Sequence, residues 1–207
     1  MEKHILKNET KDVLIRHVLN GKYLPGERLS LPAIAQELEV SVTPIREALT
    51  QLAETGIVNY IANRGFFLSE MSATEAQEAY ELIALLESSA LKGSSFSDEQ
   101  LDKLDDINND LINATDSITI LELDREFHSK LIENYQNRYA LRIVSNLRVQ
   151  ISLYELNFWH EIQKANSTEM HSKITHYIRE GKREIAAALL KENWKVSMRQ
   201  NSLINFH

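Results

Sequence analysis

The chain has 207 residues, no cysteine and a formal net charge of −7 at pH 7. The lack of cysteine excludes disulfide frameworks and thiolate chemistry, so any metal site must use histidine, carboxylate or amide ligands. No segment approaches the roughly 18 consecutive apolar residues of a membrane-spanning helix, and no long apolar run follows the charged N-terminus, so we expect a cytoplasmic protein.

Charge is distributed unevenly along the chain. Residues 1–70 hold eight Lys or Arg against nine Asp or Glu, whereas residues 71–207 hold fifteen against twenty-one. Phosphate binding is driven by Lys and Arg side chains that displace counterions. The net charge therefore does not favour a nucleic-acid partner, and the N-terminal part is less acidic than the rest but not basic.

The first 40 residues predict two short helices. Val13, Leu14 and Val18 form an apolar stripe that ends at Gly21, a residue suited to terminate a helix. After a turn at 24–26, Ser30 can cap a second helix that carries a proline in its first turn. The expected inward side chains of this second helix are Ile34, Ala35 and Leu38.

A third helix follows at once. Thr43 can cap it with Pro44 at its first position, and Gly56 ends it. The apolar face of this helix comprises Ile45, Ala48, Leu49 and Leu52. The side chains left pointing outward are Arg46, Thr50 and Gln51.

The spacing of apolar residues changes after the third helix, from a helical to a strand-like pattern. Residues 57–62 and 66–69 are rich in β-branched and aromatic side chains around the turn 63–65, which predicts a hairpin. Three helices and a two-stranded wing outline a winged helix-turn-helix, which inserts the start of its last helix into the major groove of DNA. Arg64 at the wing tip can then reach a minor groove or a phosphate. The plainer interpretation is a small structural subdomain in which Arg46 and Arg64 are only solvated.

Residues 72–207 show helical periodicity almost throughout. Six helices are predicted, with breaks near 93–95, 115–117, 137, 166–167 and 181. Ser97 with Gln100 predicts a capping box, and Ser167 is expected to cap the fifth helix of this set. Short loops between helices favour a bundle with its site in the interior. The predicted fold class is mainly α, with a winged helix-turn-helix at 1–71 and a helical bundle at 72–207.

One predicted helix places polar residues on its inward face. Asp124 and His128 lie one turn apart on a stripe of apolar residues, which suits two ligands of one metal ion. A buried carboxylate must be paired, hydrogen-bonded or bound to a cation. His171 shares the inward stripe of a later helix with Ile174 and Ile178. The plainer alternatives are an Asp–His hydrogen bond and a satisfied core histidine.

Three stretches, "LPGERL", "SVTPIREALTQLAETGIV" and "NRGFFL", resemble the N-terminal domain of GntR-family bacterial transcription regulators. The helical remainder resembles the FadR-like branch of that family, with its C-terminal all-helical ligand-binding (FCD) domain. The family usually carries an arginine just before the Thr-Pro pair, where this chain has Val42. The resemblance implies DNA contacts from Thr43, Arg46, Thr50, Arg64 and Gly65.

The resemblance also implies a metal site. Many FadR-like regulators bind a divalent metal through one Asp and three His, and Asp124, His128 and His171 match the first three positions. The fourth position falls on Asn193, whose amide oxygen is a weaker ligand than imidazole, so the expected ion is loosely held, exchangeable or absent. Zinc, nickel and manganese all suit such a ligand set. The alternative ligands, which do not match the family pattern, are His160 and His176.

A second departure concerns the effector. Relatives often hold an effector carboxylate with an arginine four residues before the glutamate matched by Glu87, and this chain has Ile83 there. Arg148, on the apolar stripe of a later helix, is then the candidate for binding the effector. The alternative interpretation of Arg148 is an exposed helix arginine.

These features predict an effector-responsive transcription regulator rather than an enzyme. We expect a homodimer that binds a palindromic double-stranded DNA operator, with an organic acid bound in the bundle and altering the separation of the two heads. One alternative is a metalloenzyme, because two histidines and a carboxylate also describe catalytic metal sites. Another is a metal-free dimerisation bundle on a DNA-binding head.

Overall fold

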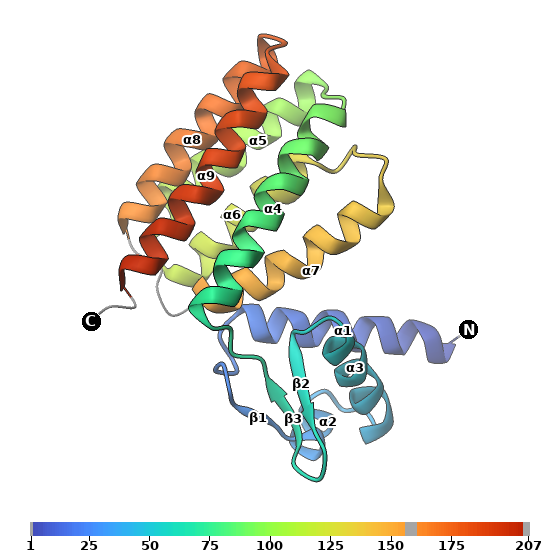
Figure 1. The fold of residues 1–207 in the computed structure, drawn as a ribbon. Coiled ribbons are helices and arrows are strands. Elements are labelled where there is room, and N and C mark those ends of the chain that lie inside the picture. The colour runs from blue at the N-terminus through green and yellow to red at the C-terminus, as the bar shows by residue number, and fades with distance from the viewer. Residues whose placement is uncertain (1, 156–160, 205–207) are drawn as a thin grey trace. The chain divides into compact units, whose positions relative to one another are not determined.

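The structure, a computed structural model, describes the chain except residues 1, 156–160 and 205–207. The chain forms two compact units, Met1–Met71 and Ser72–His207 (Figure 1). Both are dominated by helices, and the only sheet among the described residues is a small one in the first unit. The predicted fold class, mainly α with an N-terminal winged helix-turn-helix, is confirmed.

The first unit contains three helices and three short strands. Their order is α1 (Glu2–Leu19), β1 (Arg28–Leu29), α2 (Leu31–Glu37), α3 (Val42–Glu54), β2 (Val58–Ile61) and β3 (Gly65–Leu68). The strands form an antiparallel sheet in the order β1-β3-β2. The hairpin was predicted, but β1 was not, because two residues are too few to show an alternating pattern.

Helix α3 occupies the centre of this unit. The predicted apolar face is fully buried, and it packs against α1, α2 and β2 with Ile45, Ala48, Leu49 and Leu52. The predicted cap at Thr43 is wrong, since the helix begins at Val42 and Ser41 is the residue with extended backbone before it. Pro44 is therefore the third residue of the helix rather than the first, and it is tolerated there because the N–H groups of a first turn have no helical partner.

The wing turn is built by two residues with left-handed backbone. Asn63 has a φ of 62° and Gly65 a φ of 99°. Asn tolerates this region because its side chain bonds locally, and Gly because it has no Cβ. The N–H of Arg64 donates to the carbonyl of Ile61 at 3.0 Å and closes the turn. Arg64 is thereby displayed at the tip of the hairpin.

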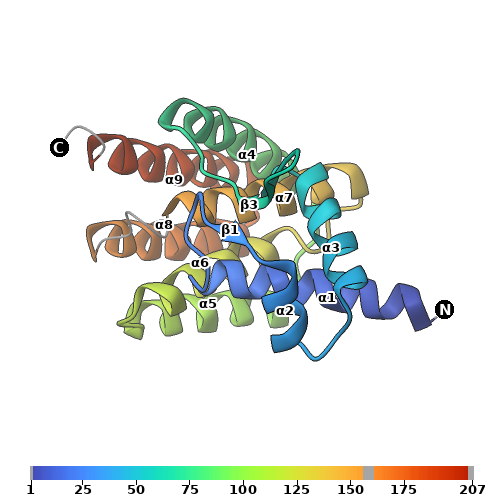
Figure 2. The ribbon, with the colours of Figure 1, turned by 90° about the horizontal axis from the view of Figure 1, so that it is seen from below.

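The described part of the second unit contains six helices, as predicted. They are α4 (Ala73–Gly93), α5 (Asp98–Asn113), α6 (Ser117–Leu131), α7 (Arg138–Glu155), α8 (Glu161–Arg179) and α9 (Arg183–Ile204). Along the bundle, α7 packs on α4, α4 on α9, α9 on α8, α8 on α5 and α5 on α6 (Figures 1 and 2). No helix among the described residues is long and apolar enough to cross a membrane.

Two predictions about helix ends in this unit are wrong. The predicted capping box at Ser97 is only half formed, because the Gln100 side chain donates instead to the carbonyl of Lys130. The predicted break at 166–167 does not exist, since α8 runs through it and Ser167 is buried within the helix rather than capping one. The Ser167 hydroxyl has a polar partner in Asp124, so a serine is accommodated in mid-helix there.

Candidate metal centre and DNA-binding surface

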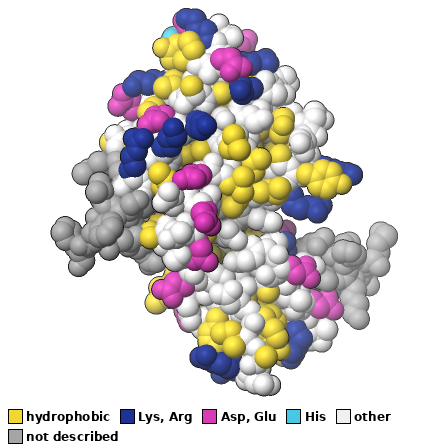
Figure 3. All heavy atoms as spheres, in the orientation of Figure 1, with side chains coloured by type: hydrophobic (Ala, Val, Ile, Leu, Met, Phe, Trp, Pro, Cys, Tyr) yellow, Lys and Arg dark blue, Asp and Glu magenta, His cyan; other side chains and the backbone are white. Residues whose placement is uncertain are grey.

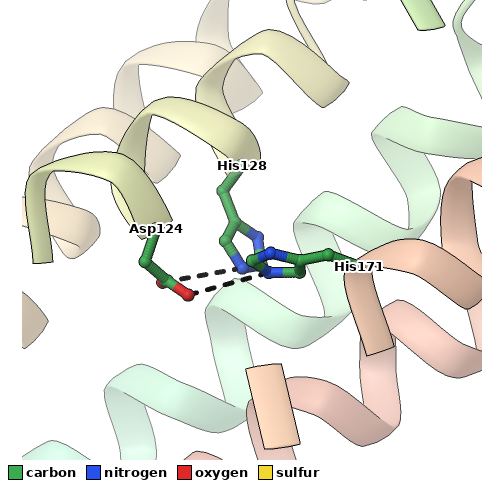
Figure 4. Close-up of side chains that lie close together, drawn as sticks. All are labelled: Asp124, His128 and His171. Atoms are coloured by element: carbon green, nitrogen blue, oxygen red, sulfur yellow. Dashed lines mark ion pairs between the residues drawn. The ribbon is translucent and has the colours of Figure 1, made fainter. Parts of the chain in front are cut away.

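Two helices bring three potential metal ligands together in the bundle interior. Asp124 and His128 project from α6, and His171 projects toward them from α8 (Figure 4). Asp124 Oδ2 lies 3.9 Å from His128 Nε2, and Asp124 Oδ1 lies 3.6 Å from His171 Nε2. One ligand atom from each residue lies within 4.8 Å of the others, and all three residues are buried.

Two atoms of this cluster have no hydrogen-bond partner among the described residues. They are Asp124 Oδ1 and His171 Nε2, and both are buried. Unpaired buried polar atoms are rare and costly in folded proteins. Their separation of 3.6 Å is longer than a hydrogen bond between them would be.

Asn108 on α5 sets the tautomer of His171. The Asn108 amide nitrogen donates to the carbonyl of Thr168 and to the hydroxyl of Ser172, each at 3.0 Å. A carbonyl can only accept, so the amide oxygen of Asn108 is the atom that faces His171 Nδ1, at 3.1 Å. His171 therefore carries its proton on Nδ1 and presents the Nε2 lone pair to Asp124.

Glu87 on α4 orients His128 in the same way. Its Oε2 lies 2.8 Å from His128 Nδ1, which therefore donates and leaves Nε2 on the side of Asp124. Trp194 also donates to Oε2, at 2.9 Å, and Arg148 Nε donates to Oε1 at 2.7 Å. A carboxylate or amide behind each imidazole is the usual outer partner of a metal-binding histidine.

Burial dominates the electrostatics of the cluster. It raises the pKa of Asp124 above its ordinary value, despite the opposing effects of His128 and the Ser167 hydroxyl. Burial, together with the charge of His128, holds the pKa of His171 well below its ordinary value, so this imidazole is neutral at pH 7. Burial alone would raise the pKa of Glu87 too, but Arg148 and His128 outweigh it and the net shift is downward. A neutral imidazole is the form that binds a metal.

The fourth position of the expected ligand set lies beside the cluster. Asn193 on α9 is 3% exposed, and its amide nitrogen lies 3.4 Å from His128 Nε2. A half-turn of the amide would present its oxygen instead. The alternative ligand His176 is 62% exposed at its side chain and pairs with Glu180, so it is remote from the cluster. The other alternative, His160, lies outside the described residues.

Arg148 is part of the buried network. It is 7% exposed, which excludes the interpretation as an exposed helix arginine. Besides Glu87, its guanidinium donates to the hydroxyl of Ser129 and to the carbonyl of His128. Ile83, at the place where relatives often carry an arginine, is fully buried in the core.

All six described helices of the bundle contribute to this network. Sequence reasoning named the candidate ligands and Arg148 but missed Glu87, Asn108 and Trp194 as neighbours that orient them. For Asn108 a signal was available, because it follows Leu104 by four residues and precedes Leu111 by three. That spacing puts an amide on the inward face of a helix, where it needs a partner.

The expected DNA-contacting residues lie on the surface of the first unit. Thr43, Arg46 and Thr50 are exposed along one side of α3, and the Thr50 hydroxyl donates back to the carbonyl of Arg46 at 2.8 Å. Arg64 is exposed on the wing, next to Gly65. This pairing of an exposed helix and a wing with a bundle that encloses polar groups is the organisation of a ligand-binding transcription regulator with a winged helix-turn-helix head.

Comparison with known families agrees with this class. Residues 6–68 match the family described as bacterial regulatory proteins, gntR family, and residues 78–195 match the FCD domain. The chain belongs to the GntR family and carries an FCD domain. It is a DNA-binding transcription regulator and not an enzyme, which removes the metalloenzyme alternative.

Individual relatives include both curated proteins and solved structures. The chain is 32% identical over 172 residues to the Nta operon transcriptional regulator of Aminobacter aminovorans, covering 81% of each protein. It is 24% identical to the uncharacterized HTH-type transcriptional regulator YdhC of Bacillus subtilis, over 84% of this chain and 80% of YdhC. The fold is shared with McbR/YncC of E. coli, with a TM-score of 0.81, 19% identity and coverage of 97% and 98%.

Proposed function

We propose that the FCD domain of this regulator binds a divalent cation through Asp124, His128 and His171, and a small carboxylate effector beside the cation. The observation that carries this proposal is the facing pair of unpaired buried atoms, Asp124 Oδ1 and His171 Nε2, 3.6 Å apart. His171 Nε2 offers a lone pair because the proton of this imidazole is on Nδ1, and Asp124 Oδ1 offers one when the carboxyl is ionised. A cation between them is the arrangement that satisfies both.

The balance of buried charge supports the same proposal. Among the described residues of the bundle, the buried charged groups other than histidine are three carboxylates and one guanidinium, namely Glu87, Asp124, Glu155 and Arg148. Glu155 accepts a hydrogen bond from the hydroxyl of Tyr80 at 2.6 Å, and Glu87 is paired with Arg148. Asp124 has no cationic partner other than the imidazoles among the described residues, so a divalent ion would compensate its negative charge.

The ligand set favours several first-row ions. Two imidazoles and a carboxylate suit zinc, nickel and manganese, and the amide oxygen of Asn193 in place of a third imidazole shifts preference toward harder ions. Such an ion supplies positive charge to an effector carboxylate in a site shielded from water. Arg148 is the residue proposed to help bind the effector, because its guanidinium, paired with Glu87, donates to the carbonyl of His128 next to the cluster.

We also propose that the regulator acts as a homodimer on a palindromic operator in the bacterial cytoplasm. The surface of α4 exposes Leu82 and Leu85, with 42% and 55% of their surface accessible. Hydrophobic side chains gather on this face of the bundle, next to basic and acidic ones (Figure 3). A groove beside them is bordered by acidic residues of α4 and basic residues of α9, Glu78, Glu81, Lys191 and Lys195. A two-fold axis would set the acidic edge of one copy against the basic edge of the other.

The proposed interface has a direct test. Leu85→Glu adds a charge to the centre of the apolar surface and should convert the dimer into monomers in sedimentation velocity at micromolar concentration. Ile112→Glu, a change at an exposed residue of α5, is the matched control and should leave the dimer intact. A Leu85→Glu protein that remains dimeric would place the interface elsewhere.

A metal-free bundle is the second candidate, and one observation favours it. Burial raises the pKa of Asp124, and a protonated Asp124 would donate to His171 Nε2. The distance of 3.6 Å between these atoms argues against that bond.

Calorimetric titration separates the two candidates. Chelator-treated protein is titrated with manganese, nickel and zinc, and then with small carboxylates in the presence and absence of the metal. Wild type should bind one ion per chain, and carboxylate binding should require the ion. His171→Ala should abolish ion binding, whereas His176→Ala on the exposed side of the same helix should not. Absence of ion binding by wild type would favour the metal-free bundle.

A further inference from the structure

The strand that sequence reasoning missed carries a cation to the outer face of the wing. In the antiparallel register, Arg28 of β1 lies opposite Phe67 of β3, and Phe67 lies opposite Asn59 of β2. The neighbouring residues Leu29 and Phe66 point into the core and are buried. Arg28 and Asn59 are exposed, so this row of the sheet faces away from the core.

The Arg28 side chain lies along this face toward the wing turn. A Cβ added to Gly65 would lie 3.8 Å from Arg28 Nε and 3.9 Å from Nη2. From the turn just before β3, the guanidinium of Arg64 lies 5.3 Å from the centre of the Phe67 ring. Two guanidinium groups thus gather around Phe67 and the bare backbone of Gly65.

Both cations are available to an outside partner. Within the described residues, neither Arg28 nor Arg64 forms an ion pair with a carboxylate, whereas Lys22 of the same unit is tied to Glu37. Residues 1–70 carry a net charge of −1, from eight basic and nine acidic residues. Attraction to a polyanion must therefore come from local groups such as this one.

We propose that Arg28 is a DNA phosphate-binding residue that acts together with Arg64 on the wing. The inference rests on the DNA-binding function of the family and on the proposed wing contact of Arg64. Arg28 lies opposite Phe67, at the base of the wing rather than at its tip, and its guanidinium extends along the sheet to Gly65. We expect it to meet the sugar-phosphate backbone rather than a base edge, and the missing side chain of Gly65 leaves room for the Arg28 guanidinium. Phosphate contacts of this kind position the protein and carry no sequence information.

The test uses full-length protein and a mixed-sequence 30-base-pair duplex, because a phosphate contact contributes to binding of any sequence. Binding is followed by fluorescence anisotropy across a range of salt concentrations. Arg28→Gln keeps the aliphatic part of the side chain but removes the charge. It should lower the slope of log K against log salt by about 0.9 for each bound protomer, which corresponds to about eightfold weaker binding at 0.1 M salt. Arg28→Lys should retain most of the slope.

Controls separate the possible outcomes. Lys22→Gln removes a positive charge from the same unit and should leave the slope nearly unchanged. If the salt slope is normal for Arg28→Gln but reduced for Arg64→Gln, the inference about Arg28 is wrong and the wing contact of Arg64 stands. Normal slopes for both variants would overturn the wing contact itself. Weaker binding with an unchanged slope and a lower melting temperature would show that Arg28 only supports the wing, which also overturns the inference.

Discussion

The charged side chains of the two units differ in exposure and in pairing. In the first unit, Met1–Met71, which is the DNA-binding head, three arginines are exposed and form no ion pairs with described residues. They are Arg28, Arg46 and Arg64. In the bundle, Glu87 and Arg148 are buried and paired with each other and with neighbouring helices. The head keeps its cations available for an outside polyanion, whereas the bundle uses its charges to orient two imidazoles.

This difference predicts where mutations affect stability and where they affect binding only. A surface arginine away from special features contributes within about 0.5 kcal/mol to folding. A buried charge left without its partner costs about 3–5 kcal/mol. Substitutions in the two units should therefore separate into binding defects and folding defects.

The largest effect is expected from Arg148→Ala. It leaves the Glu87 carboxylate buried without its cation, so the free energy of unfolding at pH 7 should fall by about 3–5 kcal/mol in urea denaturation. Arg64→Ala in the head should change it by less than about 0.5 kcal/mol. Equal effects of the two substitutions would contradict the distinction between the units.

A smaller effect is expected when the proposed metal ligands are changed. An ion present at 100 times its dissociation constant stabilises the folded protein by about 2.7 kcal/mol. Addition of chelator should remove that stabilisation from wild type and from His176→Ala, and should have no effect on His171→Ala. The measurement is thermal unfolding with saturating manganese or zinc, before and after the chelator. A chelator response retained in His171→Ala would remove this residue from the ligand set.

The smallest of the three effects concerns the head. Arg46→Ala should weaken operator binding by about 1–3 kcal/mol if Arg46 reads a base edge, and should relax the preference for one base pair. The free energy of unfolding should stay unchanged, because Arg46 is exposed and outside the core. Competition binding with operator variants measures the change. Operator affinity equal to that of wild type would exclude Arg46 from the contact.

Local patterns predicted much of this architecture. The buried face of α3 and the wing turn follow from a few residues each, because apolar spacing and turn chemistry act over short distances. Strand β1 was missed since its pairing with β3 depends on residues about 40 positions away. The predicted break at 166–167 failed because Ser167 finds its partner on another helix, which sequence spacing does not reveal.

The candidate site was predictable only in its outline. Helical spacing placed Asp124, His128 and His171 on inward faces. It did not show that Asn108 and Glu87 fix the two imidazole orientations, since these contacts join helices distant in the sequence. Burial of Arg148 was likewise undecided, because an arginine on an apolar stripe can extend to solvent.

The central claim is that one divalent ion bridges Asp124 and His171 in the bundle. Anomalous X-ray scattering from crystals grown with manganese tests it most directly, because the signal locates the ion itself. We expect one anomalous peak per chain, bonded to an Asp124 oxygen and to Nε2 of His128 and His171. Crystals of wild-type protein without a peak at this position, at a manganese concentration that saturates known manganese sites, would contradict the account.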